Sequence, residues 1–109
     1  MSDDIKNPAS KSIREAFDLT GRVAIITGGA GLLGRKHGEA VAEMGGMPIL
    51  VDLDKIKVES AAKSIRKKYA SETLGWVVDV TSQKAVQELK TKVIEKFGRI
   101  DILINNAAN

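Results

Sequence analysis

The glycine-rich segment at residues 27–34, TGGAGLLG, constrains this chain more than any other feature. It follows the apolar run 23–26 and precedes a stretch with helical periodicity. Glycines let the backbone turn sharply and approach a ligand closely, and a helix start presents free N–H groups and a positive dipole end. A buried strand, a glycine turn and a helix start together predict a cradle for phosphate groups. A plain tight turn would account for the glycines, but not for the elements in register around them.

Apolar runs alternate with amphipathic stretches from residue 18 onward. We expect strands at residues 23–27, 47–51, 74–78 and 100–104, and helices at 32–44, 55–69 and from Thr81 or Ser82 to 97. Such alternation predicts an α/β fold with a parallel sheet and right-handed crossovers. The expected architecture is a Rossmann-type, doubly wound sheet in the order 3-2-1-4, with the first two helices on one face and the third on the other. With about four strands and three helices, this sheet would be incomplete.

Apolar spacing assigns an inward-facing stripe to each expected helix. The stripes are Leu33, His37, Ala40, Val41 and Met44 in the first helix, Val58, Ala61, Ala62, Ile65 and Tyr69 in the second, and Val86, Leu89, Val93 and Phe97 in the third. His37, the only histidine, is therefore interpreted as a packed or half-exposed side chain and not as a catalytic one.

Composition and length exclude several classes of protein. A chain of 109 residues suffices for one small domain, and the absence of cysteine excludes disulfides and thiolate metal sites. Residues 1–17 form a polar leader, with a short helix around 12–17, and residues 18–109 form the domain. With no apolar signal core and no run of about 18 apolar residues, we expect a cytoplasmic protein without membrane contact. The basic cluster at 63–68 is interpreted as a solvated helix face, so no nucleic-acid partner is expected.

An acidic residue stands where a nucleotide ribose would lie. Asp52 ends the second expected strand, and residues 29–34 read as G-x-G-x-x-G. A carboxylate there accepts hydrogen bonds from ribose hydroxyls and repels a 2′-phosphate. Neither Leu53 nor Gly31 supplies a positive charge for that phosphate, so we predict that the chain binds NAD in preference to NADP. Arg35 is the exception, because it lies near the loop and could reach a phosphate. Asp52 and Asp54 could suggest a metal pair, but a ribose acceptor and a helix N-cap are preferred, and no metal is expected.

From residue 17 to residue 108, the chain resembles the short-chain dehydrogenases/reductases. Residues 18–29 are similar to that family's first strand and turn, Asp79-Val80-Thr81 to its adenine-contacting segment, and residues 105–108 (NNAA) to its Asn-Asn-Ala-Gly signature. The resemblance implies that the Asp79 side chain and the Val80 backbone meet the adenine, and that Asn106 touches a cofactor ribose. The residues expected to bind the cofactor are Gly28, Gly31, Leu32, Leu33, Gly34, Asp52, Leu53, Asp79, Val80 and Asn106.

Two positions depart from the family pattern. Leu32 stands where the middle glycine of T-G-x-x-x-G-x-G is usual, and Gly31 comes one place earlier, a spacing seen in the sugar-nucleotide epimerase branch. Ala108 replaces the glycine of the Asn-Asn-Ala-Gly signature. The Asn-Asn-Ala part of that segment favours the single-domain dehydrogenases.

The family's catalytic residues have no counterpart within residues 1–109. The resemblance implies a catalytic Ser and a Tyr-x-x-x-Lys motif, but Thr73 follows the only tyrosine, Tyr69, at the lysine position. We therefore expect the NAD-binding N-terminal half of an enzyme that moves a hydride between NAD and a small alcohol or carbonyl substrate, homo-oligomeric at full length and inactive as 109 residues. We also expect marginal stability, because the strand edge at 102–104 would be unpaired. The alternatives are a non-catalytic nucleotide-binding module and an extended-branch epimerase or dehydratase.

Overall fold

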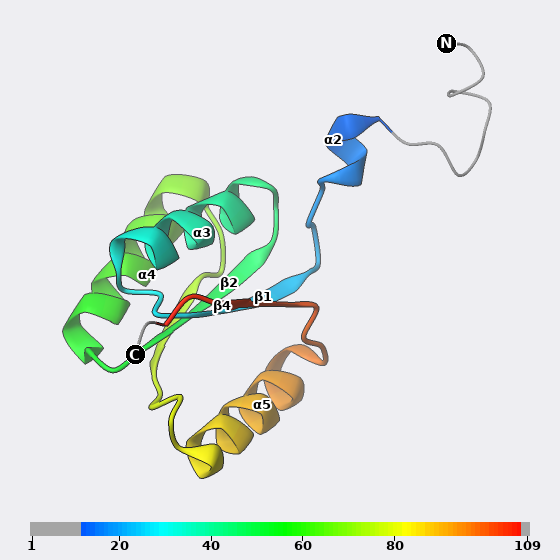
Figure 1. Cartoon of the computed structure of the whole chain (residues 1–109). Helices are drawn as coiled ribbons and strands as arrows, with labels where there is room; N and C mark the ends of the chain where they lie inside the picture. The colour runs from blue at the N-terminus through cyan, green and yellow to red at the C-terminus, as the bar shows by residue number, and fades with distance from the viewer. Residues whose placement is uncertain (1–11, 108–109) are drawn as a thin grey trace.

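The computed structural model describes residues 12–107, so residues 1–11 of the expected leader and Ala108 lie outside the described part. The elements in chain order are α2 (Ile13–Ala16), β1 (Val23–Thr27), α3 (Leu32–Glu43), β2 (Met47–Asp52), α4 (Lys55–Tyr69), β3 (Leu74–Val77), α5 (Gln83–Phe97) and β4 (Ile102–Asn105). Figure 1 shows α3 and α4 on one side of the sheet and α5 on the other. The expected α/β architecture is confirmed, and α2 corresponds to the short helix expected near residue 12.

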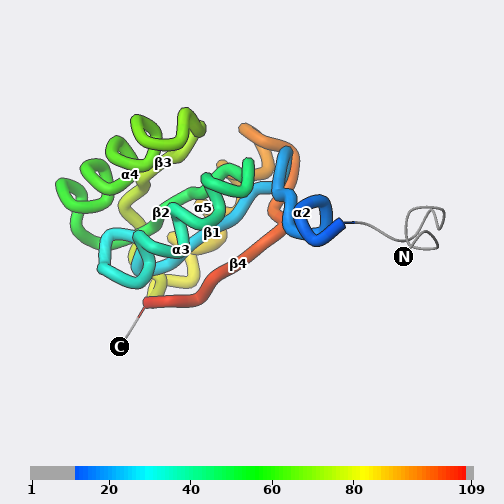
Figure 2. Tube along the Cα trace, turned by 90° about the horizontal axis from the view of Figure 1, so that it is seen from above, coloured from blue at the N-terminus to red at the C-terminus, as the bar shows by residue number. Residues whose placement is uncertain are grey.

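The four strands are parallel and lie in the order β3-β2-β1-β4, as predicted. In the view from above, β1 and β2 run through the middle and β4 follows one edge (Figure 2). On that edge, Leu103 is 66 % exposed, whereas Ile102 and Ile104 are half-buried. The predicted apolar strand edge is therefore present, with Leu103 as its most exposed side chain. No helix in residues 12–107 is long and apolar enough to cross a membrane.

The side chains of β1 point alternately to the two faces of the sheet and contribute to two separate hydrophobic cores. Ala24 and Ile26 pack with residues of α3 and α4, while Val23 and Ile25 pack with residues of α5. Successive side chains of a strand point to opposite faces, so one buried strand supplies both cores. All five residues of β1 are buried, as expected for the central region of a parallel sheet.

The stripe expected on the first helix is partly wrong. The buried residues of α3 are Gly34, Gly38, Val41 and Ala42, whereas Leu33 is 60 % exposed, His37 is half-buried and Ala40 is exposed. A Cβ built on Gly38 would lie 2.8 Å from Leu50 Cδ2, closer than real contacts allow. The helix therefore packs on the sheet through its smallest residues, a face that a hydrophobicity pattern does not detect.

The stripe on α5 differs by one position from the expected one. Leu89 and Val93 are buried and Phe97 is half-buried, but Val86 is 39 % exposed and Ala85 is half-buried. Residues four apart lie on the same helix face, so the stripe continues backwards from Leu89 to Ala85. The second expected stripe, on α4, is confirmed, with Tyr69 half-buried against its core.

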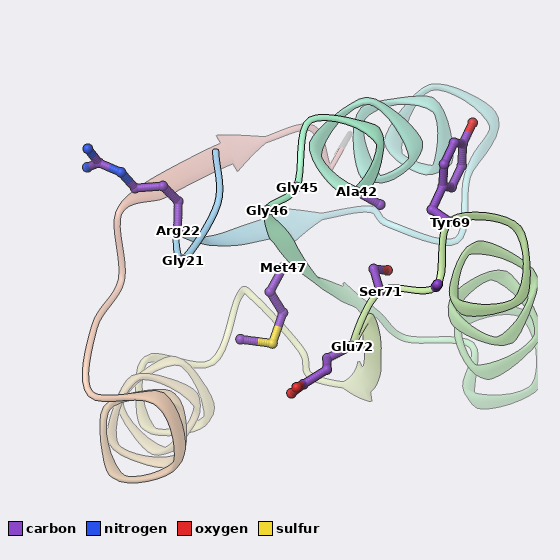
Figure 3. A pocket seen from close by; sticks show the side chains of 10 residues that line it. Gly21, Arg22, Ala42, Gly45, Gly46, Met47, Tyr69, Ser71 and Glu72 are labelled. Carbon is purple, nitrogen blue, oxygen red and sulfur yellow. The ribbon is translucent and has the colours of Figure 1, made fainter. Parts of the chain in front are cut away.

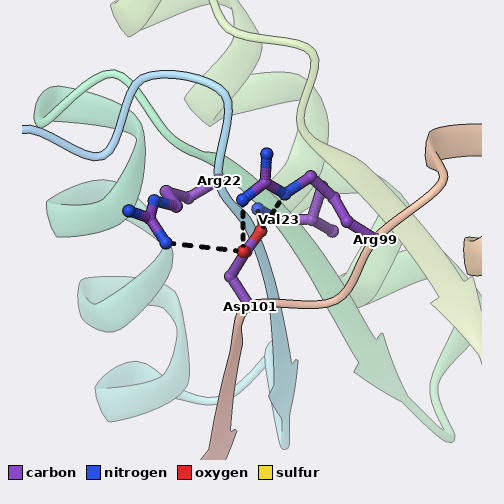
Figure 4. A network of polar contacts seen from close by, with 4 residues as sticks. All are labelled: Arg22, Val23, Arg99 and Asp101. Atoms are coloured by element: carbon purple, nitrogen blue, oxygen red, sulfur yellow. Dashed lines mark hydrogen bonds and ion pairs between the residues drawn. The ribbon is translucent and has the colours of Figure 1, made fainter.

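The start of β4 is fixed by the Asp101 side chain. We expected this strand to begin at Ile100, but its first residue is Ile102. Asp101 Oδ2 accepts the Val23 backbone N–H at 2.9 Å, and the Arg99 side chain donates to both carboxylate oxygens at 2.8 and 2.7 Å (Figure 4). The Arg99 hydrogen bond, followed by that from Val23, lowers the pKa of Asp101 to about 2. The Asp101 backbone N–H also donates to Val23 O at 2.9 Å, so Asp101 is joined to the first residue of β1 through both its backbone and its side chain.

Candidate functional site

A cavity of about 530 Å³ lies at the carboxyl ends of β1, β2 and β3. Its lining residues are Gly28, Gly31, Leu32, Leu33, Val51, Asp52, Leu53, Val78, Asp79, Val80, Thr81, Asn106 and Ala107. The fold therefore brings together every residue expected to bind the cofactor except Gly34, which is buried beside the cavity. In open α/β sheets, ligands bind beyond the carboxyl ends of the strands, which is where this cavity lies.

Two glycines allow the loop after β1 to pack closely. Gly28 has a φ of +65°, and a Cβ there would lie 3.1 Å from Ala107 Cα. A Cβ on Gly34 would overlap the Gly28 carbonyl oxygen and would lie 2.9 Å from the side-chain nitrogen of Asn106. Gly34 therefore contributes by its lack of a side chain, which lets the start of α3 approach the loop.

Three N–H groups of the loop, those of Gly29, Ala30 and Gly31, are already used within the protein. Gly29 N donates to Val51 O at 3.0 Å, Gly31 N to Gly28 O at 3.1 Å, and Ala30 N to Asp52 Oδ2 at 3.0 Å. The first N–H groups of a helix have no intrahelical acceptor, and here they belong to Leu32, Leu33 and Gly34, of which Leu32 and Leu33 line the cavity. The first turn of α3, at the positive end of its dipole, thus offers N–H donors to the cavity.

Asp52 ends β2, and both oxygens of its half-buried carboxylate are engaged. Oδ2 accepts from Ala30 N, and Oδ1 accepts from Leu53 N at 2.8 Å. Each carboxylate oxygen has two acceptor positions, so each retains one for a hydroxyl donor. The sequence placed this acid at the strand end, but it did not indicate that the acid fastens the neighbouring loop.

The turn after β3 is organised by Asp79. Its Oδ1 accepts the Thr81 backbone N–H at 2.9 Å and the Thr81 hydroxyl at 2.6 Å. These bonds, the one from the hydroxyl first, lower the pKa of Asp79 below its ordinary value. Asp79 is thus an exposed carboxylate held at the cavity rim, and Val80 beside it is 39 % exposed.

Asn106 fixes the glycine loop to the end of β4. Its backbone N–H donates to Thr27 Oγ1 at 2.9 Å, and its side-chain nitrogen donates to Gly28 O at 3.4 Å. Sequence reasoning did not select four further lining residues, Val51, Val78, Thr81 and Ala107. Each of them is adjacent to a residue that was selected, so their position beside a strand end was the available signal.

Residues weighed for other roles lie away from this cavity. Tyr69 lines a separate hollow of about 320 Å³, next to the turn at Gly45 and Gly46 (Figure 3). Asp54 caps α4 by accepting from Lys57 N at 3.0 Å, which confirms the expected N-cap. Within residues 12–107, no group of three or more His, Cys, Asp or Glu side chains is placed to hold a metal ion.

Arg35, the basic residue nearest the loop in sequence, is engaged elsewhere. Its guanidinium donates to Ser64 Oγ on α4 at 2.9 Å, and Arg35 is not among the residues that line the cavity. The basic residues of α4 interpreted as a solvated face, Lys63, Arg66, Lys67 and Lys68, are all exposed, and Arg66 also donates to Thr73 O at 2.7 Å.

Proteins of known sequence match most of this chain. It is 41 % identical over 89 residues to 3-hydroxyacyl-CoA dehydrogenase type-2 of Bos taurus. The matched segment covers 82 % of this chain and 33 % of the relative. It is 35 % identical over 99 residues to the short chain dehydrogenase/reductase dpmpG of Macrophomina phaseolina, covering 91 % and 57 %. The chain spans between about a quarter and just over half of the length of the curated relatives it matches.

Solved structures have the same arrangement of elements. NAD⁺-bound xylitol dehydrogenase superposes with a TM-score of 0.79 at 36 % identity, covering 84 % of this chain and 35 % of that one. L-sorbose reductase from Gluconobacter frateurii, complexed with NADPH and L-sorbose, gives 0.80 at 32 % identity, covering 85 % and 35 %. The family model described as short chain dehydrogenase matches residues 22–109. The chain therefore belongs to the short-chain dehydrogenase family.

Proposed function

We propose that this chain forms the NAD-binding part of an oxidoreductase that transfers a hydride between NAD and an alcohol or carbonyl carbon. The observation that carries the proposal is one cavity in which the Asp52 carboxylate and the first turn of α3 face the same space. An acceptor for ribose hydroxyls and a donor site for a pyrophosphate are thereby combined at one end of the sheet. When bound, the nicotinamide ring supplies the hydride chemistry.

The residues of the cavity fit the parts of a dinucleotide. Gly34 lets the first turn of α3 lie against the glycine loop, because a Cβ at this position would overlap Gly28 O. The N–H groups of Leu32 and Leu33 hold the pyrophosphate, and Asp52 accepts from the adenosine ribose. The apolar side chains of Leu53 and Val80, 67 % and 39 % exposed, flank the adenine.

The proposed preference for NAD over NADP rests on charge. A 2′-phosphate at the ribose would lie against the Asp52 carboxylate, and like charges in contact are unfavourable. Arg35 is not among the residues that line the cavity, and its guanidinium donates to Ser64 Oγ. The match to relatives does not select the cofactor, since the similar solved structures include one with NAD⁺ and one with NADPH.

The substrate is proposed only as a class. The similar proteins are named for a hydroxyacyl-CoA, a polyol and a ketose, which share an alcohol or carbonyl carbon as the reacting centre. The family's catalytic Ser and Tyr-x-x-x-Lys are proposed to belong to the part of the relatives that this chain does not span.

Titration with each cofactor tests the proposal. On the protein expressed from its own gene, isothermal titration should show NAD binding at least about tenfold more tightly than NADP, a difference of about 1.4 kcal/mol. Asp52→Ala should narrow this ratio. Absence of binding by either dinucleotide contradicts the cofactor role, whereas equal affinities contradict only the preference for NAD.

A further inference from the structure

We propose that Asp52 is also a positioning residue for the phosphate-binding loop, so that its carboxylate couples the ribose and pyrophosphate parts of the site. This inference rests on the function proposed above. The juxtaposition that carries it is Asp52 Oδ2 against Ala30 N, at 3.0 Å, across the gap between the end of β2 and the loop after β1.

The loop has few other attachments on its β2 side. Gly29 N donates to the Val51 carbonyl, a backbone bond that no substitution removes. The bond from Ala30 N to Asp52 is the attachment on that side that depends on a side chain. On the β4 side, Asn106 reaches the Gly28 carbonyl over a longer distance, 3.4 Å. Asp52 therefore supplies the shorter of these two side-chain attachments.

Loss of the carboxylate would leave the N–H of Ala30 without its acceptor. Ala30 is half-buried and packs against the core shared by α3 and α4. An N–H group partly removed from water is unfavourable when unpaired, so the loop would rearrange to find another acceptor. Because Ala30 lies directly before Gly31, the N-cap of α3, a rearrangement here shifts the donors of Leu32 and Leu33.

A cofactor analogue separates two effects of Asp52, its contact with the ribose hydroxyls and its hydrogen bond to the loop. NAD that lacks both the 2′- and 3′-hydroxyls of its adenosine ribose cannot donate to Asp52. If Asp52 acts only on these hydroxyls, Asp52→Ala leaves the affinity for this dideoxy analogue unchanged. If Asp52 also positions the loop, Asp52→Ala weakens the analogue, by about three- to tenfold for one lost hydrogen bond.

Asp52→Asn separates the hydrogen bond from the charge. The amide oxygen of Asn accepts from Ala30 N, so the analogue should bind this variant within about twofold of the unmodified protein. NAD itself should bind Asp52→Asn less tightly, because one acceptor oxygen and the charge are lost. The matched controls are Asp54→Ala and Asp54→Asn, which make the same changes two residues away at the cap of α4, outside the cavity lining.

The experiment measures NAD and the dideoxy analogue by calorimetry, together with ³¹P spectra of the bound analogue, on the protein expressed from its own gene. We expect the pyrophosphate resonances to move in Asp52→Ala and to return in Asp52→Asn, a change that a general loss of stability does not produce. Hydrogen exchange at Ala30 N, without ligand, should be protected in the unmodified protein and in Asp52→Asn. This measurement remains decisive if Asp52→Ala does not fold.

Three outcomes overturn the inference. The first is unchanged affinity of the dideoxy analogue in Asp52→Ala. The second is weakening by Asp52→Asn as large as that by Asp52→Ala, and the third is rapid exchange at Ala30 N in the unmodified protein. A protein that binds neither NAD nor the analogue contradicts the proposed function instead, so the two failures are distinguishable.

Discussion

The hydroxyl of Thr27 accepts the backbone N–H of Asn106 at 2.9 Å. It also accepts the N–H of Ala107 at 3.0 Å, and it lies 3.1 Å from Asn105 Oδ1, to which it donates. One side chain at the end of β1 thus fastens the segment that follows β4, although nearly 80 residues separate them in sequence. Because Gly28 comes next, this junction sets where the glycine loop begins.

Removal of this hydroxyl should destabilise the protein. Thr27→Val preserves the shape but leaves two N–H groups without their acceptor, so we expect the free energy of unfolding to fall by about 1–3 kcal/mol. Thr27→Ser retains the hydroxyl and should lose less. Urea denaturation measures both variants, and a loss in Thr27→Val no larger than that in Thr27→Ser would contradict the role assigned to the hydroxyl.

A methyl group at Gly34 should be unfavourable despite the helix propensity of alanine. Alanine exceeds glycine by about 1 kcal/mol inside a helix, but a Cβ here overlaps the Gly28 carbonyl oxygen. We expect Gly34→Ala to lose about 1–3 kcal/mol of stability through overpacking. Gly31→Ala is the matched control, because its Cβ would lie 3.4 Å from the same oxygen. A stabilised Gly34→Ala in thermal unfolding would contradict the close packing.

Two valines on α5 test the corrected stripe. Val93 is fully buried, so Val93→Ala should cost about 2–3 kcal/mol, from two lost methyl groups and the cavity they leave. Val86 is 39 % exposed, and Val86→Ala should cost less than about 1 kcal/mol. Denaturant midpoints compare the two variants. Similar losses of stability would show that Val86 lies on the buried face of α5, as the sequence predicted.

The Asp101 cluster should make stability depend on acid pH. The pKa of Asp101 lies at about 2 in the folded chain, below the ordinary value of 3.8. A lowered carboxyl pKa contributes stability above the unfolded value, and this contribution is lost as the pH falls from about 4 towards 2. Asp101→Asn should therefore lower the melting temperature at neutral pH, and the difference from the unmodified protein should shrink below pH 4. A difference in melting temperature that stays constant from neutral pH to pH 2 would show that the lowered pKa of Asp101 does not contribute to stability.

Arg35 should have little influence on cofactor choice. Because its guanidinium is bonded to Ser64, we expect Arg35→Gln to leave the ratio of NAD to NADP affinities within about twofold. Lys36→Gln is the control for the lost charge, since Lys36 is the next residue and pairs with Glu39 at 3.5 Å. A selective loss of NADP affinity in Arg35→Gln alone would place Arg35 at the 2′-phosphate.

The sequence by itself determined the elements and their order. Local signals suffice for these features, because a buried strand such as 23–27 contains the unbroken apolar run 23–26 and a helix such as 55–69 has its own apolar stripe and N-cap. Parallel strands joined by helices then allow few topologies, so the sheet order followed from handedness and crossover rules. The meeting of Asp52 with the glycine loop followed as well, because strand ends in this topology meet at one edge, whereas Asp79, Val80 and Asn106 were implied by the family resemblance.

Only the tertiary structure decided how these parts touch. The glycine face of α3 depends on how closely the helix approaches Leu50, and the start of β4 depends on Asp101 meeting Val23 across the sheet. Likewise, the TGGAGLLG segment predicts a turn, but its position is set by Asp52 from one side and Asn106 from the other. These contacts join residues from 12 positions apart, as for Gly38 and Leu50, to 78 positions apart, as for Val23 and Asp101, so they depend on distances that exist only once the chain is folded.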